Sequence, residues 1–237
     1  MKKRLKYLIF TLMMSPLILS ADIDIDFDDD FEYERSSHSE EDVTVNEDLM
    51  QEHGLLNRIL LVYEEMAKRL VNRTEGSDDV NQLNKAANII RTLLENHHEI
   101  MEETYIFPLL EEEGEYFDLV QVLRQQHLIG RQLTDFILQN STNDAIQSDV
   151  IREALAIHLN WYVVMFRPHE SREGTVILPR FRTLITDEDY KNLSHLVEEH
   201  EENLIGEGGF GRLIDDVAAI EMVLGIYDLS QFTPAID

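Results

Sequence analysis

Cysteine is absent from this chain of 237 residues, which excludes disulfides, thiolate metal sites, iron–sulfur clusters and a cysteine nucleophile. Positive charge is scarce: 20 lysines and arginines face 47 aspartates and glutamates, so the formal net charge is −27. Such an excess of negative charge argues against electrostatic binding of nucleic acid or of an anionic membrane surface. Any metal site in this chain must therefore be built from histidine and carboxylate side chains.

Long hydrophobic runs are missing beyond the N-terminus, and no later stretch approaches the ~20 apolar residues that a membrane helix needs. Residues 1–21 are typical of a secretory signal peptide, because lysines and an arginine precede an apolar run that ends in small residues. Ile18 and Leu19 stand where a small residue is preferred before the cleavage site, so an uncleaved N-terminal anchor is the alternative. We expect an exported protein, periplasmic or secreted.

Residues 22–45 form an acidic segment without convincing apolar periodicity, which predicts a disordered tail. From residue 46 onward, apolar residues recur every three or four positions, which is the period of amphipathic helices. The pattern predicts long helices over residues 47–72, 83–107, 115–139 and 145–183. Pro108 should end the second of them, and Pro168 should kink or split the fourth. Two more helices are expected over residues 187–204 and 213–224.

Four long helices joined by short turns favour an all-α fold, an antiparallel up-down-up-down four-helix bundle over residues 46–185. Residues 186–237 would form a helical C-terminal extension packed on this bundle. An internal repeat supports the arrangement: HEIMEETYIFP from His98 and HESREGTVILP from His169 share His, Glu, Glu, Thr, Ile and Pro at identical spacing. The segment EHGLLNRIL around His53 is echoed by QHLIGRQL around His127. The repeat predicts two similar helical hairpins.

The repeated histidines and glutamates predict a metal site inside the bundle. Positions four apart share one face of a helix, so each H-x-x-x-E motif directs an imidazole and a carboxylate to the same side. With a rise of ~1.5 Å per residue, the motifs and the two other histidines fall at one end of an antiparallel bundle and can share a layer. Buried groups of this kind pair or bind metal, and nitrogen and oxygen ligands without sulfur suit Fe, Mn or Zn. The candidate ligands are His53, His98, Glu102, His127, His169 and Glu173, enough for a dinuclear centre with bridging glutamates.

At these residues the sequence resembles the hemerythrin-like (HHE cation-binding) family, specifically its bacterial members. The motifs HxxxE…FP, QHxxGR and RPHxxxE carry the resemblance over about residues 48–179, and GEGGF and GIYDLSQFTP resemble an extension of some bacterial relatives. The resemblance implies a non-heme di-iron centre with the six candidates at the ligand positions. Oxygen-carrying hemerythrins, however, have a further histidine one turn from the first on the third helix. Here Leu123 and Arg131 stand one turn from His127, which counts against reversible O₂ carriage.

The resemblance implies binding or sensing of O₂, NO or redox state, with a small diatomic molecule or peroxide as the partner. Other functions stay open: a di-iron peroxidase, oxidase or NO-consuming enzyme, an iron storage or delivery protein, or a purely structural bundle. The oligomeric state is open as well. Among the other histidines, we interpret His97 as exposed or helix-flanking and His158 as a polar group of the core, and we assign no role to His195 and His200. The glycine-rich segment at residues 206–211 follows a helix and is interpreted as a turn.

Overall fold

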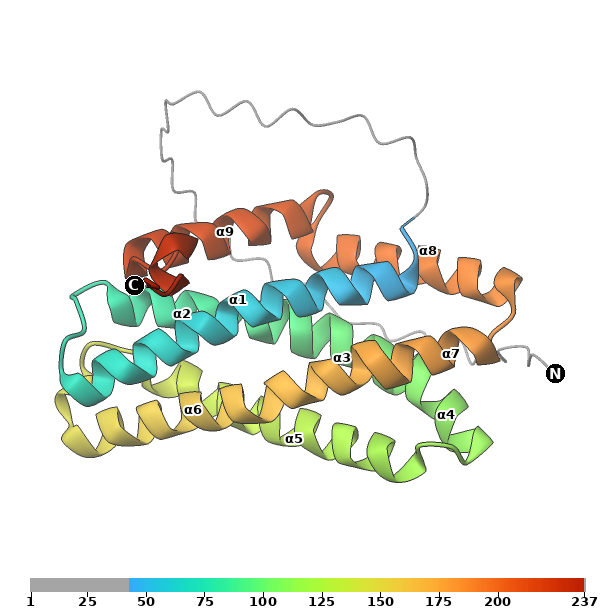
Figure 1. The fold of residues 1–237 in the computed structure, drawn as a ribbon, viewed down its shortest axis with the longest axis horizontal. Coiled ribbons are helices and arrows are strands. Elements are labelled where there is room, and N and C mark those ends of the chain that lie inside the picture. Colours follow the sequence, from blue (N-terminus) through green and yellow to red (C-terminus); the bar gives the residue numbers. More distant parts are fainter. Residues whose placement is uncertain (1–42, 237) are drawn as a thin grey trace.

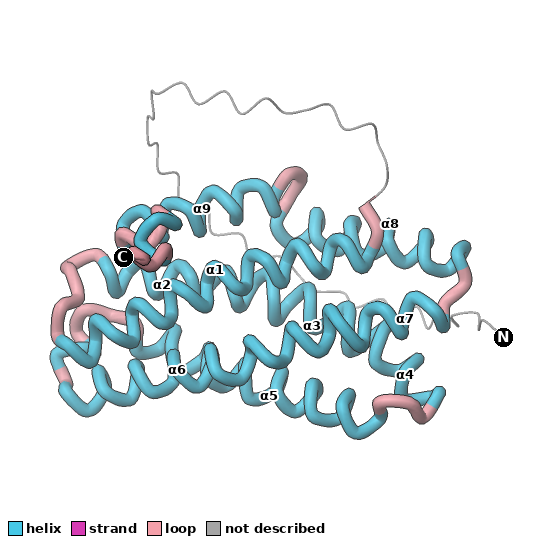
Figure 2. The backbone as a smooth tube through the Cα atoms, viewed as in Figure 1, coloured by secondary structure: helices cyan, strands magenta, loops and turns pink. Residues whose placement is uncertain are grey.

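The structure is a computed structural model that describes residues 43–236. The signal peptide expected at residues 1–21 and most of the acidic segment expected at 22–45 lie outside the described residues. Within the described range every regular element is a helix, as Figure 2 shows. None of these helices has both the length and the hydrophobicity needed to cross a bilayer.

Four long helical runs form the bundle (Figure 1). The first is α1 (Val45–Asn72), and the third is α5 (Phe117–Asn140). The second run joins α-helical and π-helical segments end to end: α2 (Asp79–Ile89), η1 (Ile90–His98), α3 (Glu99–Met101), η2 (Glu102–Ile106) and α4 (Phe107–Glu113). The fourth run follows the short turn η3 (Ala145–Gln147) and consists of α6 (Asp149–Arg172), η4 (Glu173–Ile177) and α7 (Leu178–Leu184). The remaining elements are α8 (Asp187–Ile205), α9 (Gly209–Leu224) and η5 (Leu229–Phe232).

Pro108 does not end the second run, and Pro168 does not split the fourth, contrary to what the sequence predicts. Pro108 lies in the first turn of α4, and the second run continues to Glu113. Pro168 lies inside α6, which continues to Arg172 without a split. Pro108 and Pro179 each follow a π-helical segment and open a new α-helical turn, a position where the missing N–H of proline costs little. For Pro168, the extensive packing of α6 along α1 stabilises the helix across the missing hydrogen bond.

Side-chain caps set two of the helix starts. Thr44 and Glu47 form a capping box, in which the Thr44 hydroxyl accepts from the Glu47 N–H (3.4 Å) and Glu47 Oε2 accepts from the Thr44 N–H (3.0 Å). Thr186 caps α8 by accepting from the Asp189 N–H at 3.1 Å, and the helix begins at residue 187, where the sequence predicts its start. The helix expected from residue 213 begins earlier, at Gly209, after a turn in which Gly206 and Gly208 have positive φ angles of 79° and 65°.

Two apolar clusters fill the bundle and leave a polar layer between them. The first contains Leu55 to Leu70 of α1, and the second contains Val45 and Leu49 of the same helix. The order of the two clusters along the chain reverses from each long run to the next, as an antiparallel bundle requires. Between them, every run contributes buried histidine or glutamate side chains. The candidate site therefore lies inside the bundle, with an apolar cluster above and below.

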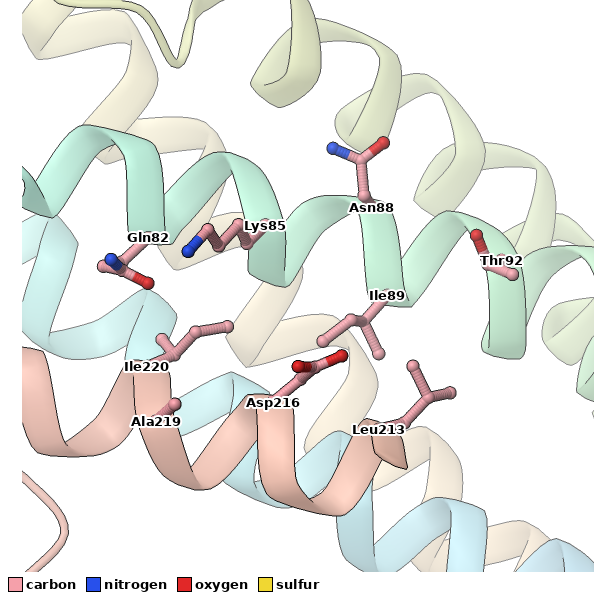
Figure 3. A pocket seen from close by; sticks show the side chains of 9 residues that line it. All are labelled: Gln82, Lys85, Asn88, Ile89, Thr92, Leu213, Asp216, Ala219 and Ile220. Carbon is pink, nitrogen blue, oxygen red and sulfur yellow. The ribbon is translucent and has the colours of Figure 1, made fainter. Parts of the chain in front are cut away.

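The C-terminal helices cover one side of the bundle (Figure 1). Helix α8 packs on α1 and η1, and α9 packs on α1 and α2. Arg58 of α1 binds the Glu221 carboxylate of α9 through two hydrogen bonds, of 3.1 and 2.6 Å. A hollow of about 410 Å³ lies between α2 and α9. Figure 3 shows the side chains that line it, among them Gln82, Lys85 and Asp216. This hollow is remote from the polar layer, because none of the candidate ligands lines it.

Candidate metal centre

The six predicted ligands meet in the polar layer as two overlapping groups of four. One group is His53, His98, Glu102 and Glu173, and the other is Glu102, His127, His169 and Glu173. Within each group, one potential ligand atom from every side chain lies within 4.8 Å of the others, and all six side chains are buried. The two glutamates belong to both groups, which is the arrangement that bridging carboxylates have in a dinuclear site.

The four histidines face one another in two pairs. His53 Nε2 lies 3.0 Å from His98 Nε2, and His127 Nε2 lies 3.1 Å from His169 Nε2. The first pair comes from α1 and η1 and the second from α5 and α6. Each long helix of the bundle thus contributes one imidazole, and every imidazole directs the same ring nitrogen to the centre of the layer.

The two glutamates lie between these pairs. Glu102 Oε2 is 3.7 Å from His98 Nε2 and 3.6 Å from His127 Nε2. Glu173 reaches both pairs as well, with one oxygen 3.4 Å from His53 Nε2 and the other 2.8 Å from His169 Nε2. Each glutamate begins a π-helical segment, η2 or η4. Such wide turns within α-helices are frequent at functional sites.

Hydrogen bonds on the outer side of the rings orient three of the histidines. His98 Nδ1 is hydrogen-bonded to Glu52 Oε2 at 2.7 Å, while His127 Nδ1 donates to Glu103 Oε1 at 2.9 Å and His169 Nδ1 to Gln126 Oε1 at 2.9 Å. A neutral imidazole that donates through Nδ1 keeps its lone pair on Nε2. Metal-binding histidines are usually held in this way.

Sequence analysis did not identify these three supporting side chains. The sequence contains a signal for two of them. Glu52 directly precedes His53, and Gln126 directly precedes His127, at matching positions of the internal repeat. Each supports the histidine of the following long helix instead of its own neighbour. The third, Glu103, follows the candidate ligand Glu102 directly, and its counterpart in the repeat is Gly174.

The two halves of the site differ at His53. Its Nδ1 has no hydrogen-bond partner among the described residues, whereas the equivalent atom of His127 is bonded to Glu103. At the position that corresponds to Glu103, the chain has Gly174, and Met50 packs so closely there that a Cβ atom would lie 2.9 Å from its sulfur. Among the four histidines, the pseudo-twofold symmetry of the repeat is therefore broken most clearly beside His53, which has lost its supporting side chain altogether.

The two carboxylates have opposite pKa shifts. Burial and the nearby Glu173 raise the pKa of Glu102 well above its ordinary value. Burial acts on Glu173 in the same direction, but the neighbouring imidazoles, that of His169 first, outweigh it and lower the pKa well below the usual range. In the metal-free protein these shifts favour a protonated Glu102 and an ionised Glu173.

The imidazoles also differ. Burial and the nearby His53 lower the pKa of His98 well below its usual value. Burial opposes the charged form of His127 too, but hydrogen bonds with Glu103 and Glu173 raise its pKa to about 9. Both His127 and His169 use Nδ1 as a donor, so their two Nε2 lone pairs would face each other at 3.1 Å. A cation, either a proton or a metal ion, is required between them.

The donor set fits a metal cation. Both oxygens of Glu102 are buried and have no hydrogen-bond partner within residues 43–236. Leaving such groups unpaired is costly, and a metal ion supplies the missing partner. Four imidazole nitrogens and two carboxylates, without sulfur, suit Fe, Mn or Zn.

The remaining histidines lie outside the two groups. His158 is half-buried on α6, where Nδ1 donates to the Ala154 carbonyl at 2.7 Å and the ring stacks on Phe136. The interpretation of His97 as exposed is wrong: its side chain is completely buried, because α8 covers η1 at this point. His200 of α8 lies against it, with the two Nδ1 atoms 2.7 Å apart.

A small cavity adjoins the ligands. Its volume is about 10 Å³, and its walls include Leu56, Leu94 and Phe166 beside the four candidate histidines. A volume of this size holds about one water-sized molecule. The apolar walls exclude larger molecules from this side of the site.

Comparisons with known proteins agree with this geometry. The family model described as "Hemerythrin HHE cation binding domain" matches residues 44–140, a range that contains His53, His98, Glu102 and His127. The chain is also similar to two proteins described as uncharacterized, Rv1995 of Mycobacterium tuberculosis and Mb2018 of Mycobacterium bovis. Each is 44% identical over 196 residues, which are 83% of this chain and 76% of the relative. No solved structure gave a significant match. With its all-α bundle and its buried histidine and glutamate groups, the chain belongs to the hemerythrin HHE cation-binding family.

Proposed function

We propose that this protein holds a pair of non-heme iron ions and binds or senses O₂, NO or redox state. The observation that carries the proposal is the pair of overlapping four-residue groups that share Glu102 and Glu173. Each group combines two imidazoles with two carboxylates, and the donor chemistry suits iron, with Mn or Zn as the other metals that fit. When bound, the iron pair supplies one-electron redox chemistry and coordination positions for a small molecule.

The chain's own residues define what such a site can accept. Glu52, Glu103 and Gln126 hold three histidines with Nε2 directed inward. Leu56, Leu94 and Phe166 restrict the adjoining cavity to about one water-sized molecule, which leaves no room for an organic substrate. A diatomic molecule or peroxide is the partner that such a confined site favours. Leu123 and Arg131 stand one turn on either side of His127, and Arg131 is engaged by Glu99 and Glu103 at 2.7 and 2.8 Å. For this reason sensing or redox chemistry is preferred to reversible O₂ transport.

One observation favours a second candidate, a di-iron oxidoreductase that consumes peroxide or NO. Glu170, beside His53, is buried enough that its pKa rises to about 7. A carboxyl group with a pKa near 7 can donate and accept protons at neutral pH. Steady turnover of peroxide or NO by the iron-loaded protein would select this candidate. Rapid loss of all iron to a chelator would instead select iron storage or delivery.

Export is part of the proposal and rests on the sequence of residues 1–21 alone. Detection of the mature protein, shortened at its N-terminus, outside the cytoplasm would support it. Full-length protein found only in the cytoplasm would remove export from the proposal without affecting the metal site.

The test of the centre is the metal content of the aerobically purified protein, together with its near-ultraviolet and visible spectrum before and after dithionite and O₂. About two irons per chain with reversible charge-transfer bands are expected. The His98→Ala variant should lose metal and melt at a lower temperature, because Glu52 and Glu102 then lose a buried partner. His158→Ala, on the same bundle but outside both groups, is the control. Failure to bind iron after anaerobic reconstitution, or unchanged metal content in His98→Ala, would overturn the proposal.

A further inference from the structure

A second cluster of ligand-type side chains lies between the bundle and α8, outside both groups of the candidate centre. One ring nitrogen of His97 and one carboxylate oxygen each of Asp48 and Glu201 lie within 4.8 Å of one another. These side chains come from η1, α1 and α8, which pack together. Figure 1 shows α8 alongside the N-terminal part of α1. The cluster therefore exists only because the C-terminal extension covers this side of the bundle.

Two fully buried polar atoms at this cluster lack hydrogen-bond partners. Neither His97 Nε2 nor Glu52 Oε1 has one within the described part of the chain. Both side chains are completely buried, and the two atoms lie 3.4 Å apart. Such groups are costly to bury unless something binds them. Asp48 and Glu201 bring two more carboxylates to the same cluster, so a bound cation would supply the missing partner.

His97 is also held as a metal ligand would be. His200 of α8 is hydrogen-bonded to Nδ1 of His97, and the two rings are stacked with their centroids 5.0 Å apart. This bond fixes the orientation of the His97 ring, and metal-bound histidines commonly have such a partner on their other nitrogen.

A surface hollow adjoins the two carboxylates of this cluster. A hollow of about 200 Å³ is lined by Asp48, Glu198 and Glu201, together with Val43, Gln51, Ser194 and Phe210. Glu198 is exposed to solvent, whereas Asp48 and Glu201 are half-buried. The three carboxylates give the hollow a negative potential, which attracts cations.

We propose that Asp48, His97 and Glu201 bind a third divalent transition-metal ion, beyond the two of the proposed centre. One imidazole with carboxylates suits Fe²⁺, Mn²⁺ or Zn²⁺ better than Ca²⁺, which prefers oxygen ligands alone. Glu52 links this site to the centre, because its Oε1 faces His97 while its Oε2 accepts from His98 at 2.7 Å. The third ion would occupy a position between the surface hollow and the buried centre.

The test is the number of Zn²⁺ ions that the metal-free full-length chain retains after dialysis, measured by elemental analysis. The wild-type protein should retain three per chain, and the double variant Asp48→Asn/Glu201→Gln should retain two. Glu199→Gln, which removes one charge from an exposed position of α8, is the matched control and should retain three. Far-ultraviolet circular dichroism verifies that each variant is folded. If Asp48→Asn/Glu201→Gln retains as many ions as the wild type, the third site is rejected.

A further variant separates this inference from the proposed function. His169→Ala removes a ligand of the centre only, because His169 belongs to one of its two groups and not to the third cluster. Loss of an ion in the double variant without any loss in His169→Ala would retain the third site and reject the centre. Loss in His169→Ala alone would retain the centre and reject the third site.

Discussion

The amide of Gln126 provides a test of how much the outer hydrogen bonds contribute to metal binding. Its Oε1 accepts from His169 Nδ1 at 2.9 Å, so Gln126→Ala should leave that ring free to rotate. The loss of such a support lowers metal affinity by about 10- to 100-fold. We expect Gln126→Ala to bind the same number of ions as the wild type, with weaker affinity in chelator competition.

The neighbouring Gln125 is the matched control for this variant. It is exposed on the same helix, and Gln125→Ala should leave the affinity unchanged. Equal affinities in the two variants would show that Gln126 does not orient a metal ligand.

Single residues of the site differ in how readily the sequence reveals them. The placement of His98, Glu102, His169 and Glu173 could be predicted, because four-residue spacing on a helix is local geometry. His97 could not, because its burial depends on α8, which lies far along the chain and folds back over η1. The role of Glu103 was equally hidden, since its bond to His127 joins two different helices.

Two glycines inside helices differ in the space around them, which leads to a prediction about stability. A Cβ atom at Gly130 would lie 2.7 Å from the ring of Phe166, which is buried. Gly130→Ala should therefore lower the free energy of unfolding by about 1–3 kcal/mol. At Gly54 of α1 a Cβ atom would have no atom within 4 Å among the described residues, and Gly54→Ala should raise stability by about 0.5–1 kcal/mol. Urea unfolding of the two variants measures this contrast, and equal changes would contradict it.

Two arginine–glutamate ion pairs should contribute differently to stability, because one is largely buried at the contact between α1 and α9 and the other is exposed. Arg58 binds Glu221 through two hydrogen bonds, and the Glu221 side chain is only 8% exposed. Arg58→Met leaves that carboxylate unpaired and should cost about 1–3 kcal/mol. Arg167 also binds Glu64 through two hydrogen bonds, but both side chains are at least 40% exposed. Arg167→Met should cost less than about 1 kcal/mol, and an equal cost in thermal unfolding would contradict this reasoning.

Helix positions were predictable where the apolar period is strong, and helix interruptions were not. Proline was expected to end the second run at Pro108, yet the chain continues through it. The reason is the π-helical segment η2, whose wider turns place Pro108 at the start of a new α-helical turn. No local pattern in the sequence distinguishes such a segment from an ordinary helix, because its hydrogen bonds shift by one residue without a change in composition.

The many buried acidic groups determine how the stability of the metal-free protein depends on pH. Burial raises the pKa of Glu99 to about 8, and that of His127 is about 9. Between pH 6.5 and 8 the folded protein keeps most of the His127 proton and at least half of the Glu99 proton, whereas the unfolded chain has lost the Glu99 proton and loses that of His127. The unfolded chain thus binds fewer protons, so the free energy of unfolding falls as pH rises, by about 1.4 kcal/mol per pH unit for each full proton of difference.

Urea unfolding at pH 6.5, 7.5 and 8.5 measures this slope. The metal-loaded protein is the control and should behave in the opposite way, because metal binding requires deprotonated ligands. A metal-free protein whose stability stays constant or increases over this range would contradict the protonation states assigned to the layer.

The sharing of Glu102 and Glu173 between both groups of ligands has a consequence for the order of events during biosynthesis. Neither group is complete until the ribosome has made residue 173, near the end of the last long helix of the bundle. A nascent or truncated chain that ends before residue 173 therefore lacks a shared carboxylate in both groups at once. If the proposed pair of ions is bound, we expect both to load only after this residue is in place. Under the proposed function, the metal that the protein acquires is set by whatever is available in the compartment where the last helix folds into place.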